Sequence, residues 1–276
     1  YDFEHYELNE TGKYQVFFEE TQGTALFKQY IWASGNSGFA LTGVGRNPQE
    51  YPTVSIENGI DGSRAIKLET KSTGQFGETV KMPIAAGNLF LGSFDVNNAV
   101  QKPLKATRFG LPFGKKPLQL KGYYKYTPGT QPFKAKDKNG NTVTIPGQED
   151  EGDIYAVLYE AAELDGQALD GNNVLTSENI VALARVEVEK KDEFTAFHVD
   201  FHYGSRIPID WPKFIRDQRD PSDDGTAPYL SFSEEKMKNY EYNLAVVFTS
   251  SKYGAYFAGS VGSTLCIDKV EIVCEK

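Results

Sequence analysis

Short runs of alternating apolar and polar residues recur along this chain, and they predict β-strands rather than helices. The strongest runs are 153–160 (DIYAVLYE), 180–190 (IVALARVEVEK), 194–203 (FTAFHVDFHY) and the two strands expected within 244–274. Weaker candidates are 13–18, 24–32, 64–70, 88–95 and 118–126. The pattern at 180–190 predicts that Ala182, Ala184, Val186 and Val188 face inward and that Arg185, Glu187 and Glu189 face water.

The last strand changes phase part of the way along. Leu265 and Ile267 share one parity, whereas Val270 and Ile272 share the other. A period of two cannot change phase without an extra residue, so the sequence predicts a β-bulge at residues 268–269 that turns the Asp268 carboxylate out of the ladder.

The segments between these runs read as loops rather than crossover helices. Residues 34–52, 127–152 and 204–231 are rich in Gly, Pro and Asn, and only 231–240 (SFSEEKMKNY) predicts a helical turn. About ten strands joined by loops predict an all-β fold, an antiparallel β-sandwich with long irregular loops. No linker divides the chain, so we expect one domain over residues 1–276.

Composition narrows the possible partners. The net charge is −9 and no basic run occurs, which argues against nucleic acid or an anionic membrane surface as a partner. No apolar run is long enough to span a bilayer. Cys266 and Cys274 lie eight residues apart in one expected strand, about 26 Å, too far for a disulfide.

Six motifs in order resemble the putative carbohydrate metabolism domain of Bacteroidetes polysaccharide-utilisation proteins. They are WASGNSGF (32–39), IAAGNLF (84–90), TRFGLPF (107–113), LKGYYKYTPG (120–129), DIYAVLYE (153–160) and residues 250–268. The opening YDFEHYEL and the closing strand also resemble galactose-binding-like carbohydrate-binding modules. This resemblance implies a jelly-roll topology with first and last strands side by side. It also implies an exported protein of the cell surface or periplasm, with a lipid anchor outside this sequence as an open possibility.

The resemblance further implies a structural calcium ion near the paired ends of the chain. Asp268, freed by the expected bulge, and Glu4 are the predicted carboxylate ligands. Calcium takes six to eight oxygens, so backbone carbonyls would have to complete the shell.

Three groups of polar residues point to catalysis or metal binding less well. Glu149, Asp150, Glu151 and Asp153 could supply the two carboxylates of a glycoside hydrolase, which lie roughly 5–9.5 Å apart, although acidic clusters beside turns are usually solvated. His198, Asp200 and His202 share a strand face, but the two histidines would be about 13 Å apart, which favours a solvent-facing role. Asp220, Ser222, Asp224 and Gly225 match the start of a calcium loop but lack its twelfth-position Glu, so a plain acidic loop is favoured.

Aromatic residues in loops give the best functional signal, because an exposed ring can cover the apolar face of a sugar. Trp211 is the first candidate for an exposed platform, followed by Tyr253, Tyr256 and Tyr229, whereas Trp32 ends a strand and is expected to be buried. We therefore predict weak binding of an oligosaccharide or polysaccharide without cleavage. The alternatives are a glycoside hydrolase that uses carboxylates on the concave sheet, and an adhesive or scaffolding subunit.

Overall fold

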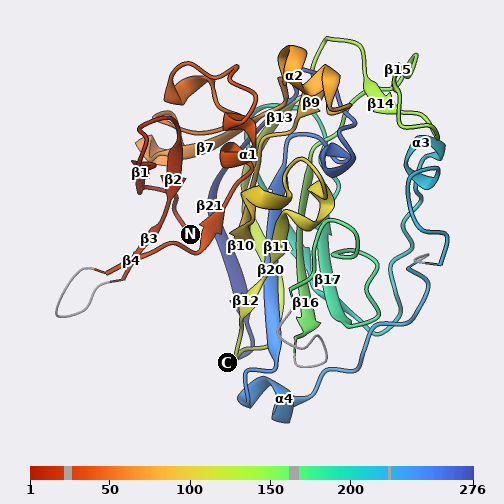
Figure 1. Ribbon diagram of the computed structural model, residues 1–276. Coiled ribbons are helices and arrows are strands. Elements are labelled where there is room, and N and C mark those ends of the chain that lie inside the picture. The colour runs from red at the N-terminus through yellow and green to blue at the C-terminus, as the bar shows by residue number, and fades with distance from the viewer. Residues whose placement is uncertain (22–26, 162–167, 223–224) are drawn as a thin grey trace.

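Two antiparallel sheets stack face to face in the computed structural model, which describes residues 1–21, 27–161, 168–222 and 225–276 (Figure 1). The larger sheet has eight strands in the order β11-β10-β20-β16-β17-β19, with β12 beside β20 and β5 beside β10. The smaller sheet has five strands in the order β18-β13-β21-β7-β6. The described strands and their short connecting helices confirm the predicted all-β jelly-roll sandwich with long irregular loops.

The larger sheet comprises β5 (Trp32–Ala33), β10 (Asn88–Phe94), β11 (Thr107–Phe109), β12 (Leu111–Pro112), β16 (Asp153–Glu160), β17 (Ile180–Val186), β19 (His202–Tyr203) and β20 (Tyr242–Thr249). The smaller sheet comprises β6 (Thr53–Ile56), β7 (Ala65–Glu69), β13 (Pro117–Thr127), β18 (Lys191–Asp200) and β21 (Thr264–Cys274). Four hairpins stand apart from both: β1 (Tyr6–Leu8) with β2 (Gln15–Phe17), β3 (Glu19–Thr21) with β4 (Phe27–Gln29), β8 (Lys71–Ser72) with β9 (Ile84–Ala85), and β14 (Lys134–Lys136) with β15 (Thr142–Thr144).

The helices are short and lie in the connections. The α-helices are α1 (Asn36–Ala40), α2 (Gly74–Thr79), α3 (Lys213–Arg216) and α4 (Glu234–Lys238). The 3₁₀ turns are η1 (Pro48–Glu50), η2 (Ile60–Gly62), η3 (Val96–Asn98), η4 (Pro103–Lys105) and η6 (Gly254–Tyr256). The helical turn predicted at 231–240 is α4, whose N-cap Ser233 accepts a hydrogen bond from the Lys236 amide.

The core between the sheets follows the alternation of the strands. Leu244, Val246 and Phe248 of β20 face Leu265 and Ile267 of β21 across it, all almost fully buried. Residues 154, 156 and 158 of β16 and residues 120, 124 and 126 of β13 extend the same core. Because each buried Leu or Phe side chain contributes about 1.5–3 kcal/mol, this layer supplies most of the driving force for stacking the sheets.

The phase change in the last strand is a β-bulge, as predicted. Lys121 of β13 pairs with Glu271 and Tyr123 pairs with Asp268, so two steps on β13 match three on β21. Lys269 takes the extra position with a φ of 47°. The bulge brings Val270 back to the face of Ile267, and both are buried in one core.

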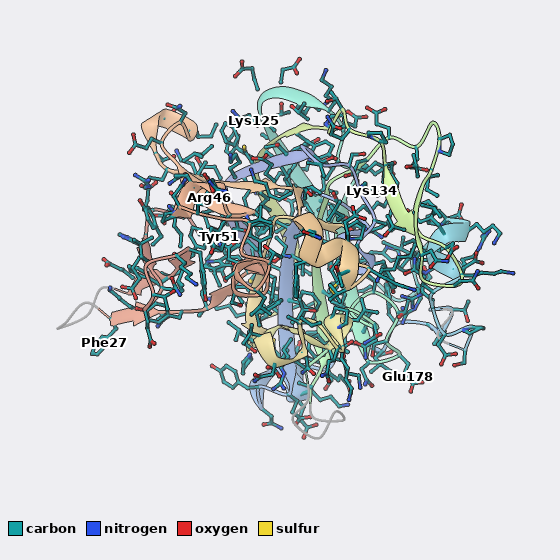
Figure 2. The ribbon with its side chains drawn as sticks, turned by 45° about the horizontal axis from the view of Figure 1, so that its top comes forward. Phe27, Arg46, Tyr51, Lys125, Lys134 and Glu178 are labelled. Carbon is teal, nitrogen blue, oxygen red and sulfur yellow. The ribbon has the colours of Figure 1, made fainter. Side chains whose placement is uncertain are left out.

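The two ends of the chain meet, but not through the first strand. Tyr1 exchanges backbone hydrogen bonds with Val270 of β21, at 2.7 and 2.9 Å. The first strand, β1, pairs with β2 instead, so the expectation that the first and last strands are direct neighbours is wrong. The hairpins β1–β2 and β3–β4 form an arm at one side of the sandwich, and Phe27 projects from it, 63% exposed (Figures 1 and 2).

The larger sheet is also buried on its outer face. Phe90, Tyr155, Val157, Ala245 and Val247 point away from the smaller sheet into a second apolar cluster. Part of this face is covered by Leu169, Val174, Leu175, Ile209, Trp211 and Tyr229. The central strands therefore carry apolar residues on both sides, as strands covered on both faces do.

Candidate functional site

A cavity of about 200 Å³ opens on the outer face of the eight-stranded sheet. Its floor is made of two neighbouring rows of cross-strand partners. One row is polar, with Asn88 paired to Thr249 and Thr249 paired to Asp153. The next row along the strands is Phe90, Val247, Tyr155 and Arg185, of which three are aromatic or apolar.

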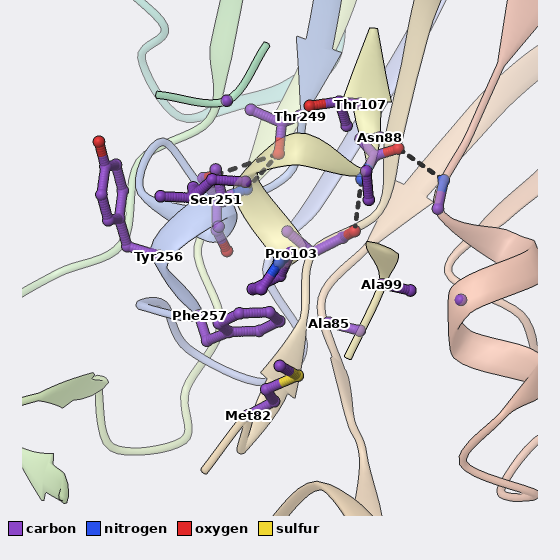
Figure 3. A pocket seen from close by; sticks show the side chains of 18 of the residues that line it. Met82, Ala85, Asn88, Ala99, Pro103, Thr107, Thr249, Ser251, Tyr256 and Phe257 are labelled. Atoms are coloured by element: carbon purple, nitrogen blue, oxygen red, sulfur yellow. Dashed lines mark hydrogen bonds between the residues drawn. The ribbon is translucent and has the colours of Figure 1, made fainter. Parts of the chain in front are cut away.

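The walls come from segments that connect the strands. They include α1 and α2, residues 99–100 after the turn η3, the turn η4, residues 171–172 and 174–175, and the η6 turn between β20 and β21. Figure 3 shows Asn88 and Thr249 at one side of the cavity, with Phe257 and Met82 at the other. Glycine permits close packing of the wall segments, because a Cβ on Gly254 would lie 2.3 Å from Cβ of Ala86.

Asn88 is fixed by its neighbours. Its Oδ1 accepts a hydrogen bond from the Gly35 amide at 2.8 Å, and its Nδ2 donates to the Ala86 carbonyl at 3.3 Å. Both bonds are drawn in Figure 3. The side chain therefore ties the start of α1 to the floor and stays in one orientation.

The charged group of the floor is an ion pair between Arg185 and Asp153. Arg185 donates from Nε and Nη2 to the two carboxylate oxygens, at 2.9 and 2.7 Å. The side chains are 18% and 4% exposed. Burial works to lower the pKa of Arg185, but the charge and hydrogen bonds of Asp153 outweigh it and raise that pKa. The expectation that Arg185 faces water is wrong, because loops cover this face of the sheet.

Three of the four predicted sugar-binding aromatics gather at the cavity. The Trp211 ring centroid lies 6.4 Å from those of Tyr253 and Tyr256, and Trp211 and Tyr256 line the cavity. Trp211 is half-buried and packs against two apolar clusters, so the prediction of an exposed platform is wrong. Its ring forms part of a wall instead, with the Arg219 guanidinium 4.4 Å from the ring centroid.

The fourth aromatic lies apart. Tyr229 is 6% exposed, its hydroxyl accepts a hydrogen bond from the Ile207 amide, and Arg206 covers its ring. It is not among the residues that line the cavity. Trp32 is 4% exposed, which confirms its predicted burial.

The acidic cluster before β16 separates into buried and exposed members. Glu149 and Glu151 are exposed, whereas Asp150 and Asp153 are 2% and 3% exposed. Asp153 is the one carboxylate among the described residues that line the cavity. The solvated cluster favoured from the sequence is therefore correct only for Glu149 and Glu151.

Asp150 lies behind the wall. Its Oδ2 accepts hydrogen bonds from Ser251 Oγ, the Ser260 amide and Ser263 Oγ, at 2.6, 2.8 and 2.7 Å. Its Oδ1 accepts from the Glu151 amide at 3.0 Å. Burial raises its pKa to about 6, although these hydrogen bonds oppose the rise. The carboxylate thereby holds both ends of the segment that carries Tyr253, Tyr256 and Phe257.

The two predicted calcium ligands both contact the loop that contains η2. Asp268 is fully buried, and its Oδ2 accepts from the Ile60 amide at 2.7 Å and from Ser63 Oγ at 2.8 Å. Glu4 Oε1 accepts from the Arg64 amide at 2.9 Å. The described residues contain no group of three or more His, Cys, Asp or Glu that could hold a metal ion. In the structure these carboxylates anchor the loop, and calcium binding stays a prediction.

The remaining candidates lie on the surface. His198, Asp200 and His202 are exposed, as the spacing argument favoured. Asp220 Oδ1 accepts from the amide and hydroxyl of Ser222, which forms a local turn, while Asp224 lies outside the described residues. Both cysteines are free, as predicted.

The polar floor of the cavity was missed by sequence reasoning. A usable signal existed in 153–160, where Asp153 and Tyr155 share the face opposite Ile154 and Ala156 in a run that is apolar on both faces. A strand of this kind requires cover on its second face, and a charged residue there must be paired.

The sequence profile of the family described as putative carbohydrate metabolism domain matches residues 2–273. Two solved structures are similar over the whole chain. One is titled a putative glycoside hydrolase from Bacteroides thetaiotaomicron, with 41% identity, a TM-score of 0.80 and 71% of that chain covered. The other is titled a putative glycoside hydrolase from Bacteroides vulgatus, with 35% identity, a TM-score of 0.77 and 97% of that chain covered.

A family 11 carbohydrate-binding module of Clostridium thermocellum matches 81% of both chains, with 7% identity and a TM-score of 0.35, too remote to say anything about this chain's ligand. No curated protein sequence matches the chain. Among the described residues, no helix is long and apolar enough to cross a membrane.

Proposed function

Because the chain belongs to the putative carbohydrate metabolism domain family, we propose that it binds a glycan in the cavity on the outer face of the larger sheet and does not cleave it. The observation that carries this proposal is the pairing of a polar floor with aromatic and apolar walls in one cavity. Sugar rings present C–H faces to aromatic surfaces and hydroxyls to amides and charged groups, and this cavity offers both.

The size of the cavity indicates the part of the glycan that binds. Its volume of about 200 Å³ is below the roughly 300–1,000 Å³ of pockets for drug-sized ligands. A space of this size suits one or two sugar rings at the end of a chain rather than the middle of a long polysaccharide. Trp211 and Tyr256 form one wall for such a ring.

Cleavage requires a second carboxylate that the described lining does not supply. Asp153 has both oxygens engaged by Arg185, and Asp150 is separated from the cavity by Ser251. A glycosidase needs one carboxyl group to protonate the leaving oxygen and another to act as base or nucleophile. This arrangement supports binding without hydrolysis.

The second candidate is hydrolysis, because the two solved relatives are titled putative glycoside hydrolases. In that case Asp150, with its pKa raised to about 6, would be the proton donor and Asp153 its partner. Asp150→Asn and Asp153→Asn would then each abolish the release of new reducing ends.

The proposed setting is an exported polysaccharide-utilisation system, at the cell surface or in the periplasm. The similarity to the two Bacteroides proteins supports this setting, and a lipid anchor beyond this sequence is compatible with it. An adhesive or scaffolding role would instead use the arm, where Leu8, Phe27 and Tyr30 are 47%, 63% and 51% exposed.

The test is a glycan panel with wild type, Trp211→Ala and Trp32→Phe, recording affinity, melting temperature and reducing-end release. Loss of the Trp211 ring should weaken binding about tenfold, since one stacked aromatic contributes about 1–2 kcal/mol. Trp32→Phe is the control, because Trp32 lies in the core between the sheets and away from the cavity. Unchanged binding by Trp211→Ala would remove the cavity as the site, and new reducing ends produced by wild type would replace binding with hydrolysis.

A further inference from the structure

Arg185 has an unused hydrogen-bond donor at the floor of the cavity. Its Nε and Nη2 are both used by Asp153, which fixes the plane of the guanidinium. Within the described part of the chain, the remaining nitrogen, Nη1, has no hydrogen-bond partner. The side chain lines the cavity and is 18% exposed, so this end of the group is open to a ligand.

Trp211 holds a second unused donor in the wall. Its Nε1 is buried, and the described residues provide no acceptor for it. A buried N–H without a partner is costly, and native proteins keep few of them. The ring lines the same cavity as Arg185.

Tyr253 lies near both Trp211 and Arg185. Its ring lies 6.4 Å from the Trp211 ring. Burial, followed by the charge of Glu151, raises the pKa of Tyr253 to about 12, and the nearby charge of Arg185 opposes that rise. Arg185 and Trp211 are thus linked through Tyr253 as well as by lining the same cavity.

The chemistry of these donors selects the ligand group. An indole N–H and a guanidinium donate and never accept, so their partner must be an acceptor. A sugar hydroxyl could accept a hydrogen bond, but it is neutral. A carboxylate or sulfate also brings a negative charge to the cationic guanidinium, and hydrogen bonds between ionised groups are shorter and stronger than neutral ones.

The charges of the described lining agree with an anion. Three cationic side chains, Arg185, Arg219 and Lys252, line the cavity against one carboxylate, in a protein whose net charge is −9. Lys252 also pairs with Glu151, which lies outside the lining, at 2.7 Å. This concentration of cations runs against the sign of the whole chain.

We propose that the bound glycan carries an anionic group, a uronate carboxylate or a sulfate, which accepts hydrogen bonds from Arg185 Nη1 and Trp211 Nε1. This inference rests on the proposed glycan-binding function and specifies its ligand class. Charge-assisted hydrogen bonds from a fixed guanidinium would then supply the specificity, while the aromatic walls hold the ring.

The experiment compares matched pairs of oligosaccharides by calorimetry on wild type. One pair is an oligogalacturonide and its methyl ester, in which each negative charge is replaced by a neutral ester with one added methyl group. The other pair is a sulfated oligosaccharide and its desulfated form. We expect the acidic member of at least one pair to bind about tenfold more tightly, with a preference that shrinks between about 50 and 300 mM salt. The pair that responds distinguishes carboxylate from sulfate.

Two substitutions test the assigned donors. Trp211→Phe keeps a ring but removes the N–H, and Arg185→Lys keeps a cation for Asp153 but removes Nη1. Each should lower the ratio of acidic to neutral affinity about tenfold. Trp32→Phe, which removes an indole N–H from the core, should leave the ratio unchanged. Melting temperatures show whether each variant is folded. If Arg185→Lys does not fold, the proposal is tested by the affinity ratio of Trp211→Phe and by the paired affinities of wild type.

Equal affinities for acidic and neutral partners would overturn the anionic ligand and leave glycan binding intact. An acidic preference that survives both substitutions would overturn the assignment to these donors. Failure to bind any member of any pair, or any glycan on the wider panel, would overturn the proposed function itself.

Discussion

Asp150 should make the stability of this protein fall as the pH rises from about 4 to 7. The folded state raises its pKa from an ordinary 3.8 to about 6, mainly by burial. A carboxyl group whose pKa is raised on folding binds its proton more tightly in the folded state. Its contribution to stability is therefore complete below pH 3.8 and is lost as the pH rises through 6.

The magnitude follows from the two pKa values. They differ by about 2.2, and at about 1.4 kcal/mol per pH unit the loss is on the order of 3 kcal/mol. This is a substantial part of the roughly 5–15 kcal/mol that stabilises a typical domain. Asp150 is 2% exposed, so solvent screening reduces the effect little.

The assay is urea unfolding of wild type and Asp150→Asn at pH 4, 5, 6 and 7, followed by tryptophan fluorescence. The asparagine side chain of the variant carries no charge at any of these pH values. Subtracting the variant's stability curve from that of wild type therefore cancels the contributions of all other titrating groups. The free energy of unfolding of wild type should fall by about 2.4 kcal/mol relative to the variant over this range, because part of the total is already lost at pH 4. Curves that stay parallel would refute the reasoning.

A matched control is Asp137→Asn. Asp137 is a partly exposed carboxylate whose pKa is lowered, first by a hydrogen bond from the Asn141 backbone amide. Its contribution is present above its ordinary pKa and is lost as the pH falls, the opposite sign to that of Asp150. For each variant, the difference between its free energy of unfolding and that of wild type is followed against pH. If this difference changed in the same direction for both variants, the assay would be measuring a general effect of charge removal and not the burial of Asp150.

Three further predictions concern the framework. Calcium at Asp268 and Glu4 predicts a higher Tm when calcium is added to metal-stripped protein, and identical melting curves with calcium and with chelator would refute that site. Asn36→Ala should cost about 1–3 kcal/mol in urea unfolding, because fully buried Asn36 bonds both the carbonyl and the amide of Thr53; a loss below about 0.5 kcal/mol would contradict this. Gly87→Ala should destabilise by about 1–3 kcal/mol, because its Cβ would lie 2.3 Å from the Glu69 nitrogen, and a wild-type Tm would show that the backbone shifts freely.

The fold could be predicted largely from the sequence, because alternation of apolar and polar residues indicates a strand with one buried and one exposed face. Residues 153–160 are β16 as expected, and the phase change located the bulge at residues 268–269. In 194–203, Phe197 and Phe201 are buried and His198 is exposed, as the parity required. Each of these features depends on neighbours within one or two residues.

The cavity could not be predicted in the same way, because its walls come from segments without periodicity. Alternation placed Arg185 on the face opposite Ala184 correctly, but it could not show that distant loops cover that face. Trp211 was recognised as a loop aromatic, yet its contacts with Tyr253 and Tyr256 join segments more than forty residues apart. Such contacts depend on tertiary packing, which local patterns do not encode.

The division of the cavity between floor and walls separates two kinds of evolutionary change. The floor belongs to β10, β20, β16 and β17, whose opposite faces form the core between the sheets, so a shift in any of these strands would disturb the whole sandwich. The walls belong to connections, which tolerate replacement far better. Relatives that share this framework can therefore diverge in what their cavities accept by exchanging wall segments. The same exchange offers a laboratory route to altered cavities without redesigning the sheets.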